Sequence, residues 1–310
     1  MYYPYLRGRQ YELIALREMI EHGLLAQCIV PIIEPVKASP TLLSTIQMFV
    51  ESKSKVVVIQ NPLAGSFMAA ISRDENYKEK YETLIKSEYI IPAFIAEPRT
   101  AHLLEPSFEK EHRKVMIISN SKDAIPFFKE LQTSSKIEAF IIPDDNSFRR
   151  SISGTRILFS DRFNKKDKNA SYKDDEDEFF SDDHRFYSED RYVGYSDFSV
   201  IGDEYTESGF APYAVAIHMV YFDSEKNLRI HHFVSDTNED INDPAGKFSQ
   251  ALSKMIEFED LLNHKTYGLE IFRSLFKRQE FPGLGTVKKI SLMHHFELIA
   301  DYFCSINTNK

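Results

Sequence analysis

The most informative feature of this sequence is a repeat of short apolar segments, each followed by polar residues and then by a helical pattern. Six segments of this kind occupy residues 28–33, 56–59, 90–96, 115–119, 137–142 and 156–159. Short, uniformly apolar strands are typical of parallel sheets, because helices cover both faces of such sheets. Regular alternation of strands and helices at this count favours a barrel over an open sheet. We therefore predict an α/β fold, specifically a TIM-barrel-like (β/α)8 barrel.

The last quarter of this barrel is expected to be irregular. The stretch Arg191–Tyr213 carries a seventh apolar segment around Phe198–Ile201, and Ala214–Tyr221 would supply the eighth strand. The eighth segment has no helical pattern before it and runs through the turn-like Asp223–Asn227 into Leu228–Val234. This pattern predicts an antiparallel hairpin rather than another β–α repeat.

Helical periodicity and stop signals indicate the helices. The pattern predicts an early helix over 8–22 and a long helical region over 66–86 that breaks near Asp74. Ser39 or Thr41 is a suitable N-cap for a helix over 42–51. After the hairpin, the remaining helices are expected over 245–263, 267–278 and 287–305. We therefore divide the chain into a barrel domain, residues 1–236, and C-terminal helices, residues 237–310, that pack on it.

Composition limits the class of protein. The 310 residues include 24 Phe and 16 Tyr, enough for a large core, and the formal net charge of −9 argues against direct binding to nucleic acid or to an anionic membrane. The two cysteines, Cys28 and Cys304, lie far apart, which excludes a disulfide framework and suits a reducing compartment. No apolar run reaches membrane-spanning length, and the N-terminus lacks a signal-peptide core. We expect a cytoplasmic protein.

Residues 165–191 form a highly charged insertion that includes the run Asp174–Glu178. Charge runs are usually solvated, which predicts a mobile loop. The aromatic pairs Phe179–Phe180 and Phe186–Tyr187 interrupt the charges, however, and disordered segments avoid aromatic residues. The alternative is a lid or a partner-docking loop that its aromatic side chains anchor.

Polar side chains follow almost every predicted strand. In a barrel these residues would surround one mouth, where barrel enzymes carry their chemistry. The candidate ligand-binding residues are Glu34, Lys37, Gln60, Asn61, Glu97, Arg99, Asn120, Asp144, Asp161, Arg162, Asn164, Asp203 and Tyr205. Carboxylates from several strands could hold a divalent cation or act as general acid and base, while Arg and Lys could bind phosphate. We expect Glu34 to be partly buried and paired with Lys37 or Arg99.

The histidines give a weaker signal. His218 lies on an apolar strand and is interpreted as a core residue, and His294–His295 is interpreted as structural. His231 and His232 are adjacent on a strand and must point to opposite faces, so at most one can face a pocket. The sequence has none of the HExxH, GxSxG, phosphate-binding-loop or GxGxxG patterns, and spacing alone identifies no nucleophile.

Three sequence blocks resemble the phage beta-protein family. The first is YYPYLRGRQYELIALRE, in which Tyr3, Pro4, Leu6 and Arg7 are followed by Glu12, Leu13, Ala15 and Leu16. The second block contains Pro31 and Glu34, and the third contains Gly202, Asp203 and Tyr205. The resemblance implies a TIM-barrel-like fold. Bacterial relatives of this type are often encoded beside a restriction-nuclease-like protein, which implies a phage-defence-type module of two proteins; the acidic insertion is a departure from the shorter phage members.

Two functional classes follow from these observations. One is a barrel scaffold or sensor that pairs with a nuclease-like partner protein. The other is a metal-assisted hydrolase or lyase that acts on a phosphorylated or nucleotide-like ligand at the barrel mouth. Carboxylates that converge within metal-bridging distance would favour the enzyme, whereas scattered or ion-paired carboxylates would favour the scaffold.

Overall fold

The computed structural model describes residues 1–97, 111, 113–206, 212–262 and 264–308. Within these residues the chain forms two compact units. Unit 1 comprises Met1–Leu13, Gln27–Ser160 and Phe186–Asp197, and unit 2 comprises Ile14–Ala26, Asp161–Arg185 and Phe198–Lys310. This division differs from the sequence-based boundary at residue 236, because the hairpin and most of the acidic insertion group with the C-terminal helices.

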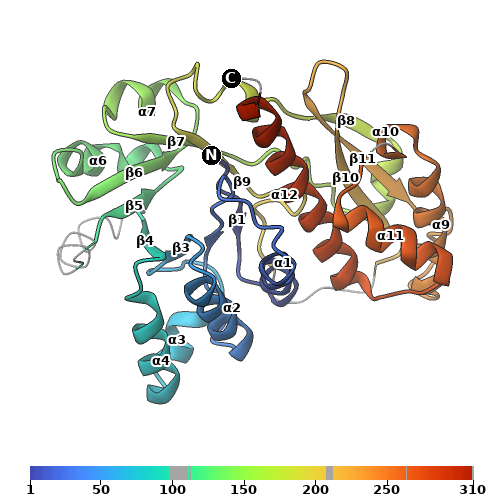
Figure 1. Ribbon diagram of the computed structural model, residues 1–310, viewed down its shortest axis with the longest axis horizontal. Coiled ribbons are helices and arrows are strands. Elements are labelled where there is room, and N and C mark those ends of the chain that lie inside the picture. The colour runs from blue at the N-terminus through green and yellow to red at the C-terminus, as the bar shows by residue number, and fades with distance from the viewer. Residues whose placement is uncertain (98–110, 112, 207–211, 263, 309–310) are drawn as a thin grey trace. The chain divides into compact units, whose positions relative to one another are not determined.

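Unit 1 contains the parallel sheet of the predicted barrel (Figure 1). Its eight strands follow chain order apart from β8, which belongs to unit 2: β1 Tyr5–Leu6, β2 Ile32–Ile33, β3 Val56–Ile59, β4 Ile90–Ile95, β5 Val115–Ile118, β6 Ile137–Ile142, β7 Arg156–Ser160 and β9 Gly194–Asp197. A parallel bridge from Tyr2 to Tyr195 joins the two edges, so that the sheet is a nearly closed barrel. The prediction of a TIM-barrel-like α/β fold is confirmed.

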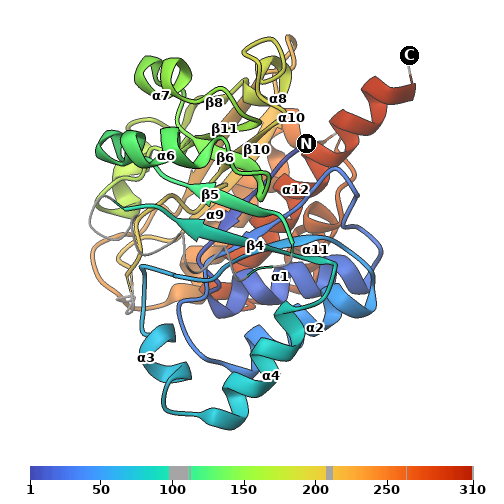
Figure 2. The same ribbon diagram turned by 90° about the vertical axis from the view of Figure 1, so that its left-hand side faces the viewer.

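Helices alternate with these strands. The first, α1 Gln10–Glu21, is divided between the two units after Leu13. Those within unit 1 are α2 Pro40–Glu51, α3 Phe67–Ile71, α4 Glu75–Ile85, α6 Ile125–Leu131 and α7 Asn146–Ser151, with a short 3-10 turn at Lys122–Ala124. Figure 2 shows α2 beside α4, and the Tyr77 hydroxyl donates to the carbonyl oxygen of Ser39, 3.0 Å away, between them. Ser39 caps α2 by accepting from the Leu42 amide, and Asp74 caps α4 at the predicted break. All four residues of β3 are buried, as expected for a strand with both faces covered.

Three segments at the ends of the barrel differ from the sequence-based prediction. The eighth barrel strand is Gly194–Asp197, whereas the apolar segment Phe198–Ile201 forms a turn, with Ser199 in the left-handed region at a φ of 52°. Tyr5–Leu6, which reads as an extended lead-in, is the first barrel strand. Ala214–Tyr221 is therefore not needed to complete the barrel, and it lies in a separate sheet.

That separate sheet is the centre of unit 2. It is antiparallel and consists of β10 Ala216–Phe222, β11 Leu228–Val234 and β8 Asp177–Ser181, so the predicted hairpin is confirmed. The helices α9 Pro244–Glu257, α10 Glu259–Leu262, α11 Tyr267–Arg278 and α12 Leu284–Thr308 follow the hairpin in the chain (Figure 1). Alternate residues of β10, among them Ile217 and Met219, pack with Phe248 and Phe272 in one apolar core.

The acidic insertion is folded rather than a long loop. It contains the 3-10 turn η2, Asn169–Lys173, the strand β8, and α8, Asp183–Phe186. Tyr172 and Phe180 are each 2% exposed, whereas Phe179 is 53% exposed. The run of acidic residues pairs with specific cations: Asp175 with Lys166 and Asp177 with Arg229. Among the described residues, no helix is long and apolar enough to cross a membrane.

Candidate functional site

Glu34, which follows β2, is the most deeply buried of the predicted site residues. Its side chain is 0% exposed and forms an ion pair with Arg7. Oε2 also accepts from the Tyr5 hydroxyl at 2.8 Å, and Oε1 accepts from the backbone amides of Leu63 at 2.8 Å and Ala64 at 3.0 Å. Burial is more complete than predicted. Glu34 pairs with Arg7 and the predicted partner Lys37 is exposed, whereas the other predicted partner, Arg99, lies outside the described residues.

This network fixes the loop that follows β3. Gly65 has a φ of +74°, and a Cβ atom there would lie 2.2 Å from the carbonyl oxygen of Val36, so no other residue fits without a shift of the backbone. Tyr5 stacks on Phe159 with ring centroids 5.4 Å apart. Burial, and then the negative charge of Glu34, raise the pKa of Tyr5 well above its ordinary value, so its hydroxyl remains a donor.

Two other candidates in unit 1, Asn61 and Asp144, form contacts within the unit. Asn61 binds both backbone groups of Ile95, at 2.8 Å each, and thereby joins the ends of β3 and β4. Asp144 accepts from the Tyr192 hydroxyl at 3.1 Å and pairs with Arg149. The remaining candidates there are Gln60, which donates to the Val58 carbonyl oxygen, Glu97, which is half-buried, and Asn120, which is exposed.

The candidates in unit 2 form separate contacts. Asp161 accepts from the backbone amides of Phe163 at 3.0 Å and Asp203 at 2.9 Å. Arg162 binds Asp183 through two guanidinium nitrogens, at 2.8 and 2.6 Å. Asp203 is exposed and Tyr205 is half-buried. Asn164 donates at 3.0 Å to Glu178, which belongs to the cluster described next.

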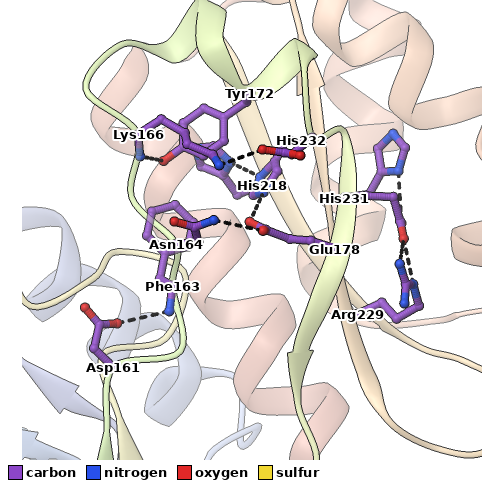
Figure 3. Close-up of polar contacts among 12 residues, drawn as sticks. Asp161, Phe163, Asn164, Lys166, Tyr172, Glu178, His218, Arg229, His231 and His232 are labelled. Carbon is purple, nitrogen blue, oxygen red and sulfur yellow. Dashed lines mark hydrogen bonds and ion pairs between the residues drawn. The ribbon is translucent and has the colours of Figure 1, made fainter.

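A cluster that sequence reasoning missed lies on the face of the small sheet turned away from the core that β10 shares with α9 and α11 (Figure 3). His218 on β10 and His232 on β11 are directly paired in register, and their Nδ1 atoms are 2.7 Å apart. His232 Nε2 lies 3.1 Å from Oε1 of Glu178 on β8. The centroid of the Tyr172 ring lies 4.7 Å from that of His218 and 4.4 Å from that of His232.

His231 faces the other way, as its position next to His232 predicts. Its Nδ1 lies 3.2 Å from Asp177, and its ring lies 4.3 Å from that of Phe258. A signal for the histidine pair was present in the sequence. A turn over Asp223–Asn227 pairs Phe222 with Leu228, and counting back along both strands brings His218 opposite His232.

Burial lowers the pKa of both paired histidines, so neutral imidazoles are favoured at pH 7. For His218 the next cause is the neighbouring His232, whereas for His232 the hydrogen bond to Glu178 opposes the effect of burial. Among the described residues, no group of three or more His, Cys, Asp or Glu side chains is arranged to hold a metal ion. The cluster is therefore best described as an acid–base chain.

Comparisons with known proteins identify no relative. No family model matches the chain, and neither the curated proteins nor the solved structures contain a significant match.

Proposed function

We propose that this protein is a barrel scaffold or sensor of a bacterial, phage-defence-type module, and that it pairs with a nuclease-like partner protein in the cytoplasm. The observation that carries the proposal is the environment of Glu34. Four donors surround this carboxylate, which is 0% exposed, so its oxygens are already committed to protein groups. A carboxylate in this state stabilises structure and is not presented to a ligand.

The other charged residues at the strand ends support the same function. Asp144 is paired with Arg149, and Asp145 caps α7 while it pairs with Lys122. A metal-assisted hydrolase or lyase acting on a phosphorylated ligand would require carboxylates with open coordination positions. Ion-paired carboxylates suit a scaffold better, and the sequence resemblance supplies the expectation of a nuclease-like partner.

The loop held by Glu34 offers a surface for that partner. Leu63, whose amide donates to Glu34, is 53% exposed, and Met68 on α3 is 50% exposed. Exposed apolar side chains on a rigidly held segment are typical of contact surfaces between proteins. Glu34 would then act indirectly, because it orients the backbone that presents Leu63.

The test is co-expression of the tagged protein with the product of the adjacent open reading frame. We expect the two to co-purify, and we expect Leu63→Asp to reduce the recovered partner at least tenfold. Ile241→Asp is the matched control, because Ile241 is 50% exposed in unit 2. Absence of a complex, or an equal loss in both variants, would refute the proposed contact.

A further inference from the structure

The hydrogen atoms of the histidine pair can be assigned from its neighbours. At neutral pH a carboxylate only accepts hydrogen bonds, so His232 Nε2 must donate to Glu178 across their 3.1 Å contact. A neutral imidazole has a single N–H, so His232 Nδ1 is an acceptor, and His218 Nδ1 donates to it across 2.7 Å. His218 Nε2 therefore keeps a lone pair. The assignment follows from the order Glu178, His232, His218.

The inner end of this chain is buried, whereas its outer end is only partly covered. His232 is 0% exposed, and the second oxygen of Glu178 accepts from Asn164 at 3.0 Å (Figure 3). His218 is only half-buried, and the described residues form no hydrogen bond with its Nε2 atom. The Phe163 ring packs against His218, with ring centroids 5.1 Å apart and an angle of 72° between the ring planes.

Charged groups from four segments of unit 2 act on the pair. Glu178 on β8 favours a positive charge on His232, whereas Lys166 of the insertion and His231 on β11 oppose it. Lys166 is in turn paired with Asp175, which weakens its effect. Lys288 on α12 opposes a positive charge on His218. A proton that enters at His218 is thus best stabilised on His232, beside Glu178.

We propose that Glu178, His232 and His218 form a proton relay, and that His218 Nε2 is the general base of an acid–base site in unit 2 for a ligand that offers a hydroxyl proton. In the proposed step, the O–H bond of an alcohol or of water breaks, and its proton forms a new N–H bond at His218 Nε2. The electron pair stays on the oxygen. The Nδ1 proton of His218 passes to His232 Nδ1, which leaves an imidazolium beside Glu178.

The first experiment determines the tautomers in the wild-type protein. Nuclear magnetic resonance of ¹⁵N-labelled histidine side chains at pH 7 should show His218 protonated at Nδ1 only and His232 protonated at Nε2 only. This measurement needs no variant, so it decides the relay even if a substitution prevents folding. The opposite tautomer at His218 would overturn the proposal, because Nε2 would then have no lone pair.

The second experiment measures hydrolysis of p-nitrophenyl acetate, an activated ester for which water is the hydroxyl donor. We expect the wild-type rate above buffer to fall at least tenfold in His218→Gln. Glu178 acts on His218 only through His232 and is a positioning residue. For Glu178→Gln we therefore expect a severalfold loss in kcat with KM unchanged. His231→Gln is the matched control and should retain the rate within twofold. Equal rates in wild type and His218→Gln would refute the general base.

Discussion

The two units bury carboxylates in different ways. In unit 1, Glu34 is surrounded by four donors that use both of its oxygens, and its side chain is 0% exposed. In unit 2, the Glu178 side chain is 22% exposed and contacts His232, which in turn contacts the half-buried His218. In the first arrangement both carboxylate oxygens are used, and the second arrangement ends at a half-buried imidazole.

This difference separates a structural role from a chemical one. A saturated buried carboxylate resists change, since its removal leaves several donors without an acceptor. A chain of groups that ends near solvent can accept or release a proton without breaking the fold. Substitutions in the two arrangements should therefore have effects of different size.

The largest effect is expected for Glu34→Ala. The substitution leaves the Arg7 charge, the Tyr5 hydroxyl and two backbone amides without their acceptor, and removal of one member of a buried ion pair costs about 3–5 kcal/mol. Urea unfolding should show this loss in the free energy of unfolding. Glu51→Ala is the control, because Glu51 is exposed on α2. Equal stability of the two variants would show that Glu34 is not the anchor of its loop.

The second effect concerns Glu297 on α12, a carboxylate of unit 2 that is 8% exposed. It accepts from the Tyr267 amide at 2.6 Å. Burial, and then the negative charges of Asp301 and Glu270, raise its pKa from 4.5 to about 7, although the Tyr267 amide lowers it. The folded state therefore favours the protonated form, and its stability falls as pH rises from 4.5 through 7.

Glu297→Gln should remove this pH dependence, because the amide oxygen still accepts from Tyr267 and carries no charge. The variant should match wild type near pH 4.5 and be more stable by about 1–3 kcal/mol at pH 8. Thermal unfolding at both pH values measures the difference. Glu257→Gln, on an exposed residue of α9, is the control and should follow wild type. A variant less stable than wild type at pH 8 would contradict the raised pKa.

Most of the fold could be predicted because many elements carry their own signal. The β-branched run Val56–Ile59 is β3, Asp74 caps the helix after the predicted break, and Tyr267–Arg278 is α11 with the predicted bounds. The strands that close the barrel carry little signal. Tyr5–Leu6 has two residues, and Gly194–Asp197 reads GYSD, a polar sequence. These segments become strands because they pair with neighbouring strands, and the residue pattern along the chain carries no signal of that pairing.

The candidate site could be predicted only in part. Position after an apolar strand predicts a buried and paired Glu34, which the structure shows, while a ligand-binding role for Glu34 stays a prediction. The pattern does not identify the partner, since Arg7 is 27 residues away in the chain. The histidine pair depends on the register of the hairpin and on Glu178, 54 residues before His232. The interpretation of His218 as a core residue does not include these partners, because strand register brings them together.

The next prediction removes one donor from Glu34. Tyr5→Phe deletes the 2.8 Å hydrogen bond and keeps the ring that stacks on Phe159. Because three donors remain, the loss should be about 1–2 kcal/mol, well below that of Glu34→Ala. Tyr11→Phe, at a residue that is 39% exposed, is the control for loss of a hydroxyl group. A loss as large as that of Glu34→Ala would mean that Tyr5 alone holds the carboxylate.

The smallest effect is expected when one donor is removed from Glu178. Asn164→Ala deletes the 3.0 Å hydrogen bond to Oε2, but Asn164 is exposed and water can replace it. The free energy of unfolding should change by no more than about 0.5 kcal/mol, the usual range for surface substitutions. The tautomers of His218 and His232 should also stay as in wild type, since Oε1 still accepts from His232. A loss equal to that of Tyr5→Phe would mean that Glu178 is as closed to water as Glu34, and the distinction between the two units would fail.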